Sequence, residues 1–201
     1  MSEENNNTGE GQPTRVMRNA SAILAARAIG NIFRLGAAFK AAAYLGSNAW
    51  GLFGRLISSL EIMRVLTNFG LDTVSIRTVA LGRRSPAEVV ANLLGIKTIM
   101  AGIGLLVVVA LTLLLDRWAE QRWLLLALGL GLFPQAYASS LMVRFQASHT
   151  MERLVPVEAV TGGVYLGGVY LVALLGLGVS AVIGVHVTWE FLTVLLVALV
   201  W

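Results

Sequence analysis

The chain has 201 residues, of which 57% are hydrophobic and only 13% are charged, and its mean hydropathy is +0.76. These values exclude an ordinary soluble domain and predict a membrane protein. The formal net charge of +4 is not gathered into a basic run interleaved with aromatic residues, so nucleic acid is not expected as a partner, and the lack of cysteine excludes disulfides and thiolate metal sites.

The N-terminal sequence MSEENNNTGEGQPTR is polar and does not contain the apolar core of a cleavable signal peptide. We expect residues 1–18 to form a disordered cytoplasmic tail. The remainder, 19–201, is apolar enough to form one membrane domain.

Apolar blocks of about 20 residues each match the length that a helix needs to cross a bilayer. In lipid, every backbone polar group must be paired within the protein, so such blocks are expected to be helical. The sequence therefore predicts an all-α polytopic membrane protein with six transmembrane helices in one bundle. The predicted spans lie near 20–43, 51–71, 89–115, 123–143, 155–176 and 180–201.

The first two spans are joined by the short segment from Gly46 to Gly51, which predicts a helical hairpin. An alternative is that the alanine-rich first span lies on the membrane surface as a basic amphipathic helix. The direct passage into the second span favours the hairpin.

Several residues predict where later helices begin and bend. Ser85, Pro86 and Glu88 form an N-cap, a first-turn proline and a capping-box glutamate before the third span. Pro156 similarly opens the fifth span. Pro134 lies inside the fourth span, where loss of a backbone hydrogen bond predicts a kink.

The fifth span contains a GxxxG spacing formed by Gly163 and Gly167, flanked by Gly162 and Gly168. Small residues at this spacing allow helix backbones to approach closely in membranes, so the pair is expected to serve helix packing. A phosphate-binding glycine loop would need a preceding strand, which this sequence context does not predict.

The positive charges predict the orientation of the bundle. With the N-terminus in the cytoplasm, the cytoplasmic segments carry most of the arginines, whereas the opposite side has only Arg117 and Arg122, offset by Asp116 and Glu120. The cytoplasmic set comprises Arg15, Arg18, Arg77, Arg83, Arg84, Arg144 and Arg153.

Charged residues within the spans are the candidate functional residues, because such residues are costly in a bilayer and usually face a bundle interior or a watery cavity. The candidate substrate-binding residues are Arg27, Arg34, Arg55 and Arg64, and the candidate ion-coupling residues are Glu61, Glu158 and Glu190. Structural ion pairing is an alternative for each. No metal site is expected.

Structural or interfacial roles, without contact to a substrate, are expected for other charged residues. Lys40 and Lys97 are expected to extend toward the outer and inner interfaces, respectively. Asp72 is expected to be solvated near the cytoplasmic end, and Glu61 is expected to pair with Arg64 three residues later. His186 and Glu190 are spaced so that they can pair on one helix face.

Ordered motifs after residue 18 resemble polysaccharide (lipid-linked oligosaccharide) flippases of the multidrug/oligosaccharidyl-lipid/polysaccharide exporter superfamily. They are the Ala26-Arg27 pair, YLGSNAWGLF at 44–53, NFGLDTVSIRTVA at 68–80, ANLL at 91–94, RFQA at 144–147 and the segment 151–158. The resemblance implies the N-terminal half of a two-bundle fold around a central cavity.

By this resemblance, the chain would flip undecaprenyl-diphosphate-linked oligosaccharide across a bacterial or archaeal cytoplasmic membrane for cell-surface polysaccharide biosynthesis. Its arginines would bind the diphosphate, since guanidinium groups stay charged and bind phosphate bidentately. The chain departs from the family in having only one six-helix bundle and a more highly charged first span, with Arg34 and Lys40. We therefore expect a fragment that needs a second six-helix half or a homodimer, with membrane lipids around it.

Two alternatives stay open: a drug or metabolite cation antiporter of the same superfamily, and a non-transporting membrane fragment. No paired catalytic carboxylates and no nucleophile with an adjacent base are evident, so an enzyme is not expected, and no cofactor is expected.

Overall fold

The computed structural model describes residues 11–114, 120–148 and 150–201, although the side chains of 11–20, 22, 23 and 26 lie outside the description. The predicted all-α fold is confirmed for these residues, which contain no strand. The helices are α1 (Gly11–Asn68), α2 (Leu71–Ala80), α3 (Pro86–Leu114), α4 (Arg122–Leu130), α5 (Leu132–Ala147), the 3₁₀ turn η2 (Met151–Leu154), α6 (Val155–Leu174) and α7 (Val179–Val200).

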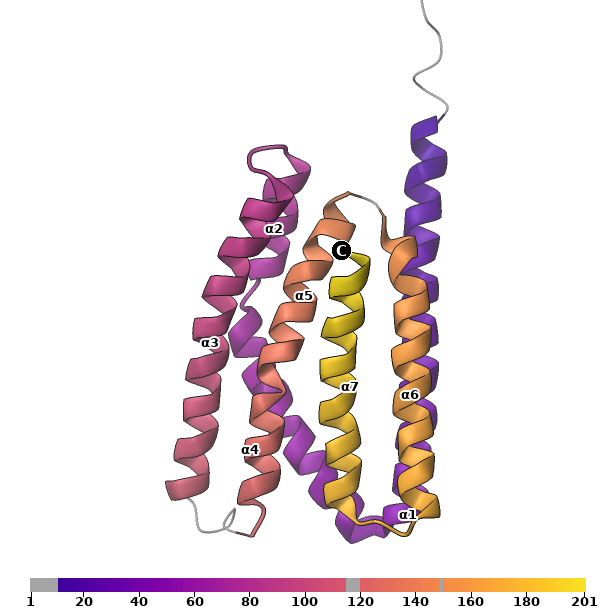
Figure 1. Ribbon diagram of the computed structural model, residues 1–201, viewed down its shortest axis with the longest axis vertical. Helices are drawn as coiled ribbons and strands as arrows, with labels where there is room; N and C mark the ends of the chain where they lie inside the picture. Colours follow the sequence, from indigo (N-terminus) through magenta and orange to yellow (C-terminus); the bar gives the residue numbers. More distant parts are fainter. Residues whose placement is uncertain (1–10, 115–119, 149) are drawn as a thin grey trace, which may run out of the picture.

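The helices lie along one bundle axis, and α4 continues in the same direction into α5, as the last part of α1 does into α2 (Figure 1). Four stretches are long and apolar enough to cross a membrane: Pro86–Leu114, Arg122–Ala147, Met151–Leu174 and Val179–Val200. The chain is therefore a helical membrane protein with four candidate spans. The two spans predicted before residue 72 fall in α1, which is not among these four candidates.

Helix α1 is bent at Gly46, whose backbone (φ 71°, ψ 176°) is not helical. A positive φ of this kind is easily adopted only by glycine. The bend divides α1 into a first limb beside α6 and a second limb that climbs back behind the other helices (Figure 1). This is the helical hairpin that the sequence predicts. Because α1 begins at Gly11, helix extends into the range 1–18 that was expected to be disordered; residues 1–10 lie outside the described part of the chain.

A second break separates α1 from α2. Phe69 (φ 28°) and Gly70 (φ 75°) both have positive φ, and Phe69 is the only non-glycine residue with this geometry in the described part of the chain. Helix α2 then has no buried residue of its own. Helix α2 is therefore packed against α3 and α5 only through half-buried side chains.

The start of α3 follows the sequence prediction. Ser85 Oγ accepts a hydrogen bond from the backbone N–H of Glu88 at 3.2 Å, and Pro86 is the first helical residue. Pro156 likewise lies in the first turn of α6. Ser85 pairs a backbone N–H that the start of a helix would otherwise leave without a partner. Each proline removes such an N–H, because proline has none.

The helix interruption predicted from Pro134 is confirmed. It falls at Gly131, between α4 (Arg122–Leu130) and α5 (Leu132–Ala147), within one candidate span. Pro134 has no N–H to donate to the carbonyl of Leu130, four residues back, and its ring crowds that carbonyl. The proline therefore accounts for the break between α4 and α5.

The packing role predicted for this glycine cluster is confirmed for Gly162 and Gly168, whereas Gly163 and Gly167 pack against no other helix of the described chain. A Cβ added at either glycine would meet no atom within 4 Å. Their neighbours make the close contacts: a Cβ on Gly162 would lie 2.7 Å from Phe33, and one on Gly168 would lie 2.7 Å from Val185. The GxxxG pair is on the open face of α6, and the flanking glycines face α1 and α7.

Candidate functional site

Arg64 is the centre of a charged cluster between the second limb of α1 and α7. Its side chain is only 11% exposed. Nη1 donates to Glu61 Oε1 at 2.6 Å, as the spacing of three residues predicts, and Nη2 donates to Glu190 Oε1 of α7. One guanidinium therefore links two carboxylates from two helices, which is the geometry that its planar, forked donors favour.

His186 lies one turn before Glu190 on α7, and its Nε2 is 3.7 Å from Glu190 Oε1. This places the two side chains together as their spacing predicts. Neither ring nitrogen of His186 has a hydrogen-bond partner among the described residues, and neither does Arg64 Nε. Buried polar atoms without partners are costly, at about 1–3 kcal/mol each, so these atoms keep unused hydrogen-bonding capacity beside Glu190.

A second ion pair joins the first limb of α1 to α6. Arg34 Nη2 lies 3.9 Å from Glu158 Oε2, and Arg34 Nε donates to the carbonyl of Gly30 at 3.1 Å. A Cβ on Gly30 would lie 2.6 Å from Glu158 Oε2 and 2.9 Å from Arg34 Nη2. Gly30 therefore provides the space in which this pair forms.

Aromatic rings connect the two ion pairs. Arg34 Cζ lies 5.7 Å from the ring centroid of Trp189, within the range of a cation–π contact. The Trp189 ring is 5.2 Å from that of Tyr165 and 5.3 Å from that of His186. We call these rings the aromatic wall; they line the same pocket as Arg34 and Arg64.

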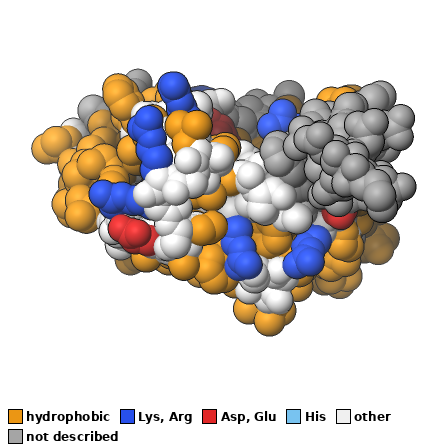
Figure 2. All heavy atoms as spheres, turned by 90° about the horizontal axis from the view of Figure 1, so that it is seen from above, with side chains coloured by type: hydrophobic (Ala, Val, Ile, Leu, Met, Phe, Trp, Pro, Cys, Tyr) orange, Lys and Arg blue, Asp and Glu red, His pale blue; other side chains and the backbone are white. Residues whose placement is uncertain are grey.

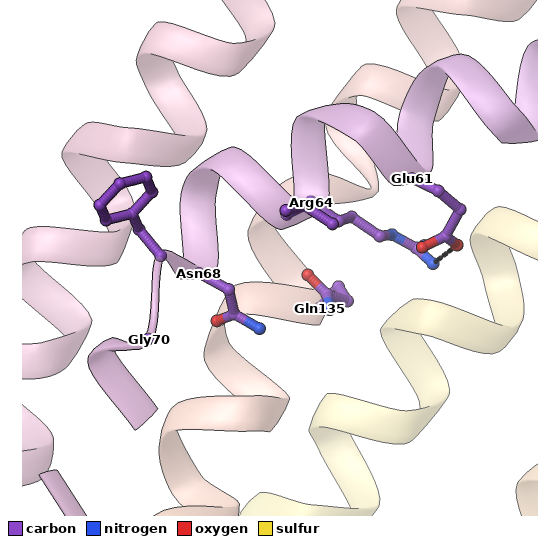
Figure 3. Close-up of a pocket in the computed structure, with 7 residues that line it drawn as sticks. Glu61, Arg64, Asn68, Gly70 and Gln135 are labelled. Atoms are coloured by element: carbon purple, nitrogen blue, oxygen red, sulfur yellow. Dashed lines mark hydrogen bonds and ion pairs between the residues drawn. The ribbon is translucent and has the colours of Figure 1, made fainter. Parts of the chain in front are cut away.

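These groups line a pocket of about 210 Å³ between α1, α6 and α7. Its lining comprises Arg34, Phe53, Ile57, Glu61, Arg64, Tyr165, His186 and Trp189. A second pocket, of about 470 Å³, shares Glu61 and Arg64 and extends to the break before α2. Figure 3 shows Gln135 of α5 and Asn68 lying beside Arg64 in this second pocket. We call the two together the charged pocket.

The structure places the predicted site residues in two groups. Arg34, Arg64 and Glu61 line the charged pocket, and Glu158 and Glu190 pair with its arginines. Arg27 and Arg55 are exposed on α1, line neither part of the pocket and form no ion pair with a described residue.

The expected roles of Lys97 and Asp72 are wrong. Lys97 does not extend to an interface: it is completely buried, and its Nζ donates to Asp72 Oδ1 and to Ser139 Oγ, each at 2.6 Å. Asp72 is paired and its side chain is only 27% exposed. Burial of an ammonium requires such partners, because its desolvation is otherwise uncompensated. Lys40 Nζ, in contrast, lies 4.9 Å above the ring of Tyr170.

Sequence analysis did not identify Trp189, Tyr165 or Gly30 as site residues. Trp189 could have been found, since His186, Trp189 and Glu190 share one helix face at spacings of three and four residues. Tyr165 and Gly30 reach the site only through the packing of α6 against α1, which no local pattern indicates.

The chain matches no family model, no curated protein and no solved structure in the comparisons. The described residues contain no cluster of three or more histidine, aspartate or glutamate side chains that could hold a metal ion. Fold and site together define a helical membrane protein with a charged, partly aromatic pocket among its helices. Its function is argued from that pocket.

Proposed function

We propose that this chain is one half of a membrane flippase that moves undecaprenyl-diphosphate-linked oligosaccharide across a cytoplasmic membrane. The observation that carries the proposal is that Arg34 and Arg64 line one pocket within a bundle of apolar helices. A diphosphate that crosses the low-dielectric core needs cations along its route, and guanidinium groups supply them without losing their charge.

The partners of Arg64 suggest how binding and release would occur. Glu61 and Glu190 hold its guanidinium when no substrate is present. A diphosphate also presents pairs of anionic oxygens that can accept from two N–H groups of a guanidinium, so it would replace one or both carboxylates. The displaced Glu190, buried on α7, would then favour uptake of H⁺ or Na⁺. Glu61, Glu158 and Glu190 are therefore proposed as ion-coupling residues, with Arg34 and Arg64 in contact with substrate.

The proposed topology has six crossings, with both limbs of α1 in the membrane and the N-terminus in the cytoplasm. In that arrangement, Arg27, Arg55 and Glu61 would be exposed at membrane depth. Charged side chains there need protein or water around them. We propose that a second six-helix half, or a second copy of this chain, covers the α1 face and completes the cavity with Arg27 and Arg55 inside it.

A cation antiporter is the second candidate, and the charges of the pocket favour it. Arg34 and Arg64 are set against Glu61, Glu158 and Glu190, which leaves one carboxylate in excess. The aromatic wall of Trp189 and Tyr165 could also bind an organic cation through its ring faces.

Binding by the purified chain in nanodiscs separates these functions. The probes are undecaprenyl diphosphate and tetraphenylphosphonium, a lipophilic organic cation. The flippase proposal predicts that undecaprenyl diphosphate binds, that Arg34→Gln and Arg64→Lys each weaken binding at least about tenfold, and that Arg153→Gln, an exposed control, does not. Arg64→Lys keeps the charge beside Glu190, so it tests the forked geometry of the guanidinium.

The other outcomes identify the alternatives. Selective binding of tetraphenylphosphonium that is lost in Glu190→Gln would support the antiporter. Binding of neither probe would favour a non-transporting fragment. Full complementation of a flippase-deficient strain by a demonstrably monomeric product would contradict the need for a second half.

A further inference from the structure

A groove of about 260 Å³ lies between α2 and α3, away from the charged pocket. The two helices are antiparallel around the turn at 81–85 (Figure 1), so the end of α2 lies beside the start of α3. Thr78 and Arg84 therefore line the groove near the turn, whereas Leu71, Val74 and Ile96 line it farther along the helices. The groove is polar at the end of the bundle and apolar toward its middle.

The polar end is surrounded by positive charge. Arg77, Arg83 and Arg84 are exposed around the turn, and Glu88, which accepts from Arg84 Nη1 at 3.2 Å, is the only carboxylate between residues 73 and 114. Figure 2, which looks onto this end of the bundle, shows several cationic side chains (blue) spread over it. Among the described residues, the side chains of Ser75 and Asn92 in the groove have no hydrogen-bond partner.

The depth of the groove matches that of a lipid. Helix α3 is one of the four candidate spans, and the groove follows its first turns, from the cap at Ser85 to Ile96. The start of a membrane span lies at the level of lipid headgroups, and a stretch of about ten residues extends about 15 Å inward. The cationic end is therefore at headgroup level and the apolar end is at acyl-chain level.

We propose that this groove binds an anionic glycerophospholipid of the surrounding membrane. Arg84 and Arg83 would bind the phosphate, Asn92 and Ser75 would bond the glycerol ester region, and one acyl chain would lie between Val74 and Ile96. Basic pockets between membrane helices recognise anionic headgroups in this way.

The bound lipid would also support α2. This helix has no buried residue and follows the Phe69–Gly70 break. Both Val74 and Ile96 are exposed in the groove, at 66% and 44%, and an acyl chain would cover them. The lipid would therefore add apolar contact to α2, which otherwise lies against α3 and α5, independently of what the charged pocket transports.

Native mass spectrometry of the detergent-purified chain tests the site, with phosphatidylglycerol and phosphatidylcholine as probes of equal acyl composition. We expect phosphatidylglycerol to be retained preferentially. Removing both cations in Arg83→Gln/Arg84→Gln should weaken its retention about 25-fold, or about fivefold for each arginine. Arg153→Gln, which removes an exposed cation from η2 at the same end, should change nothing.

A second variant tests the apolar end without altering charge. Val74→Trp fills the groove beside Ile96 and should lower retention of phosphatidylglycerol while the arginines remain. Circular dichroism checks that each variant keeps its helices. Three results would overturn the proposal. The first is equal retention of the two lipids, and the second is undiminished retention of phosphatidylglycerol in either the double-arginine variant or Val74→Trp. The third is full displacement of phosphatidylglycerol by inorganic phosphate alone.

Discussion

Lys97 and Asp72 form a partly buried ion pair between α3 and α2, with 2.6 Å between Lys97 Nζ and Asp72 Oδ1. The same ammonium donates to Ser139 on α5, so one side chain connects three helices. This ion pair reinforces the packing of α2 against α3 and α5, in which no residue of α2 is fully buried. The bond lies one turn beyond the Phe69–Gly70 break, where the chain is able to change direction.

Lys97→Met should release α2 while the rest of the bundle keeps its structure. The substitution leaves Asp72 without its cation and removes the link to Ser139. We expect faster amide hydrogen exchange across residues 71–80, by about tenfold, because the mostly buried Asp72 carboxylate is left without its cation. Exchange in α7 should change little. Hydrogen-exchange mass spectrometry in detergent measures both segments.

The matched control for Lys97→Met is Lys40→Met, which removes a lysine that lies over the ring of Tyr170. It should leave exchange in α2 unchanged. Lys97→Met/Asp72→Asn should recover part of the protection, because no unpaired charge remains. Unaltered exchange of residues 71–80 in Lys97→Met would show that the pair does not hold α2.

Adjacent glycines on α6 should respond oppositely to the same change. Gly162→Ala places a Cβ 2.7 Å from Phe33 and should destabilise the protein by about 1–3 kcal/mol, the usual cost of overpacking. Gly163→Ala places its methyl group in open space and should be neutral or stabilising by up to about 1 kcal/mol. Thermal unfolding of the two variants in one detergent gives the comparison. Equal effects would mean that α6 is rotated relative to the described packing.

The Arg64–Glu190 pair should be far more sensitive to substitution than a surface pair. Arg64→Met strands a carboxylate that is only 6% exposed, and it should cost about 3–5 kcal/mol of stability. Arg64→Met/Glu190→Gln should recover most of this loss. The exposed Arg84–Glu88 pair is the control, and Arg84→Met should change stability by no more than about 1 kcal/mol. Similar losses in both single variants would contradict the burial of the cluster.

Local patterns predicted the parts of the fold that depend on neighbouring residues. Three such features each follow from residues within a few positions of one another: the helix start at Ser85–Pro86, the break at Gly46 and the Glu61–Arg64 pair. Each involves either a backbone preference or a helix-face spacing, so the sequence contains all the information required.

Features that depend on which helices meet were predicted incorrectly or not at all. Gly162 and Gly163 are neighbours in sequence, and only the packing of α6 against Phe33 of α1 decides which of them is confined. Lys97 has no acidic residue within four positions on its own helix. Its partner Asp72 lies on α2, so the pair could not be assigned from spacing. The charged pocket has the same origin, since Arg34, Arg64 and Trp189 come from three separate helical segments.

The orientation and number of crossings give the last prediction. The turn at 81–85, the 3₁₀ turn η2 and the C-terminus lie at one end of the bundle, whereas Gly46 and the α6–α7 turn lie at the other (Figure 1). Arg83, Arg84 and Arg153 belong to the first end, so the positive-inside rule predicts that this end is cytoplasmic. Reporter fusions at 82–86 and 148–152 should therefore report the cytoplasm, and fusions at Ser47 and Gln121 should report the opposite side. Ser47 is the decisive position, because α1 is not among the four most apolar stretches. A cytoplasmic signal at Ser47 would mean that the first limb of α1 does not cross the membrane, and the number of crossings would then be lower than six. An external signal at Ser47 together with a cytoplasmic signal at 82–86 requires both limbs of α1 to cross.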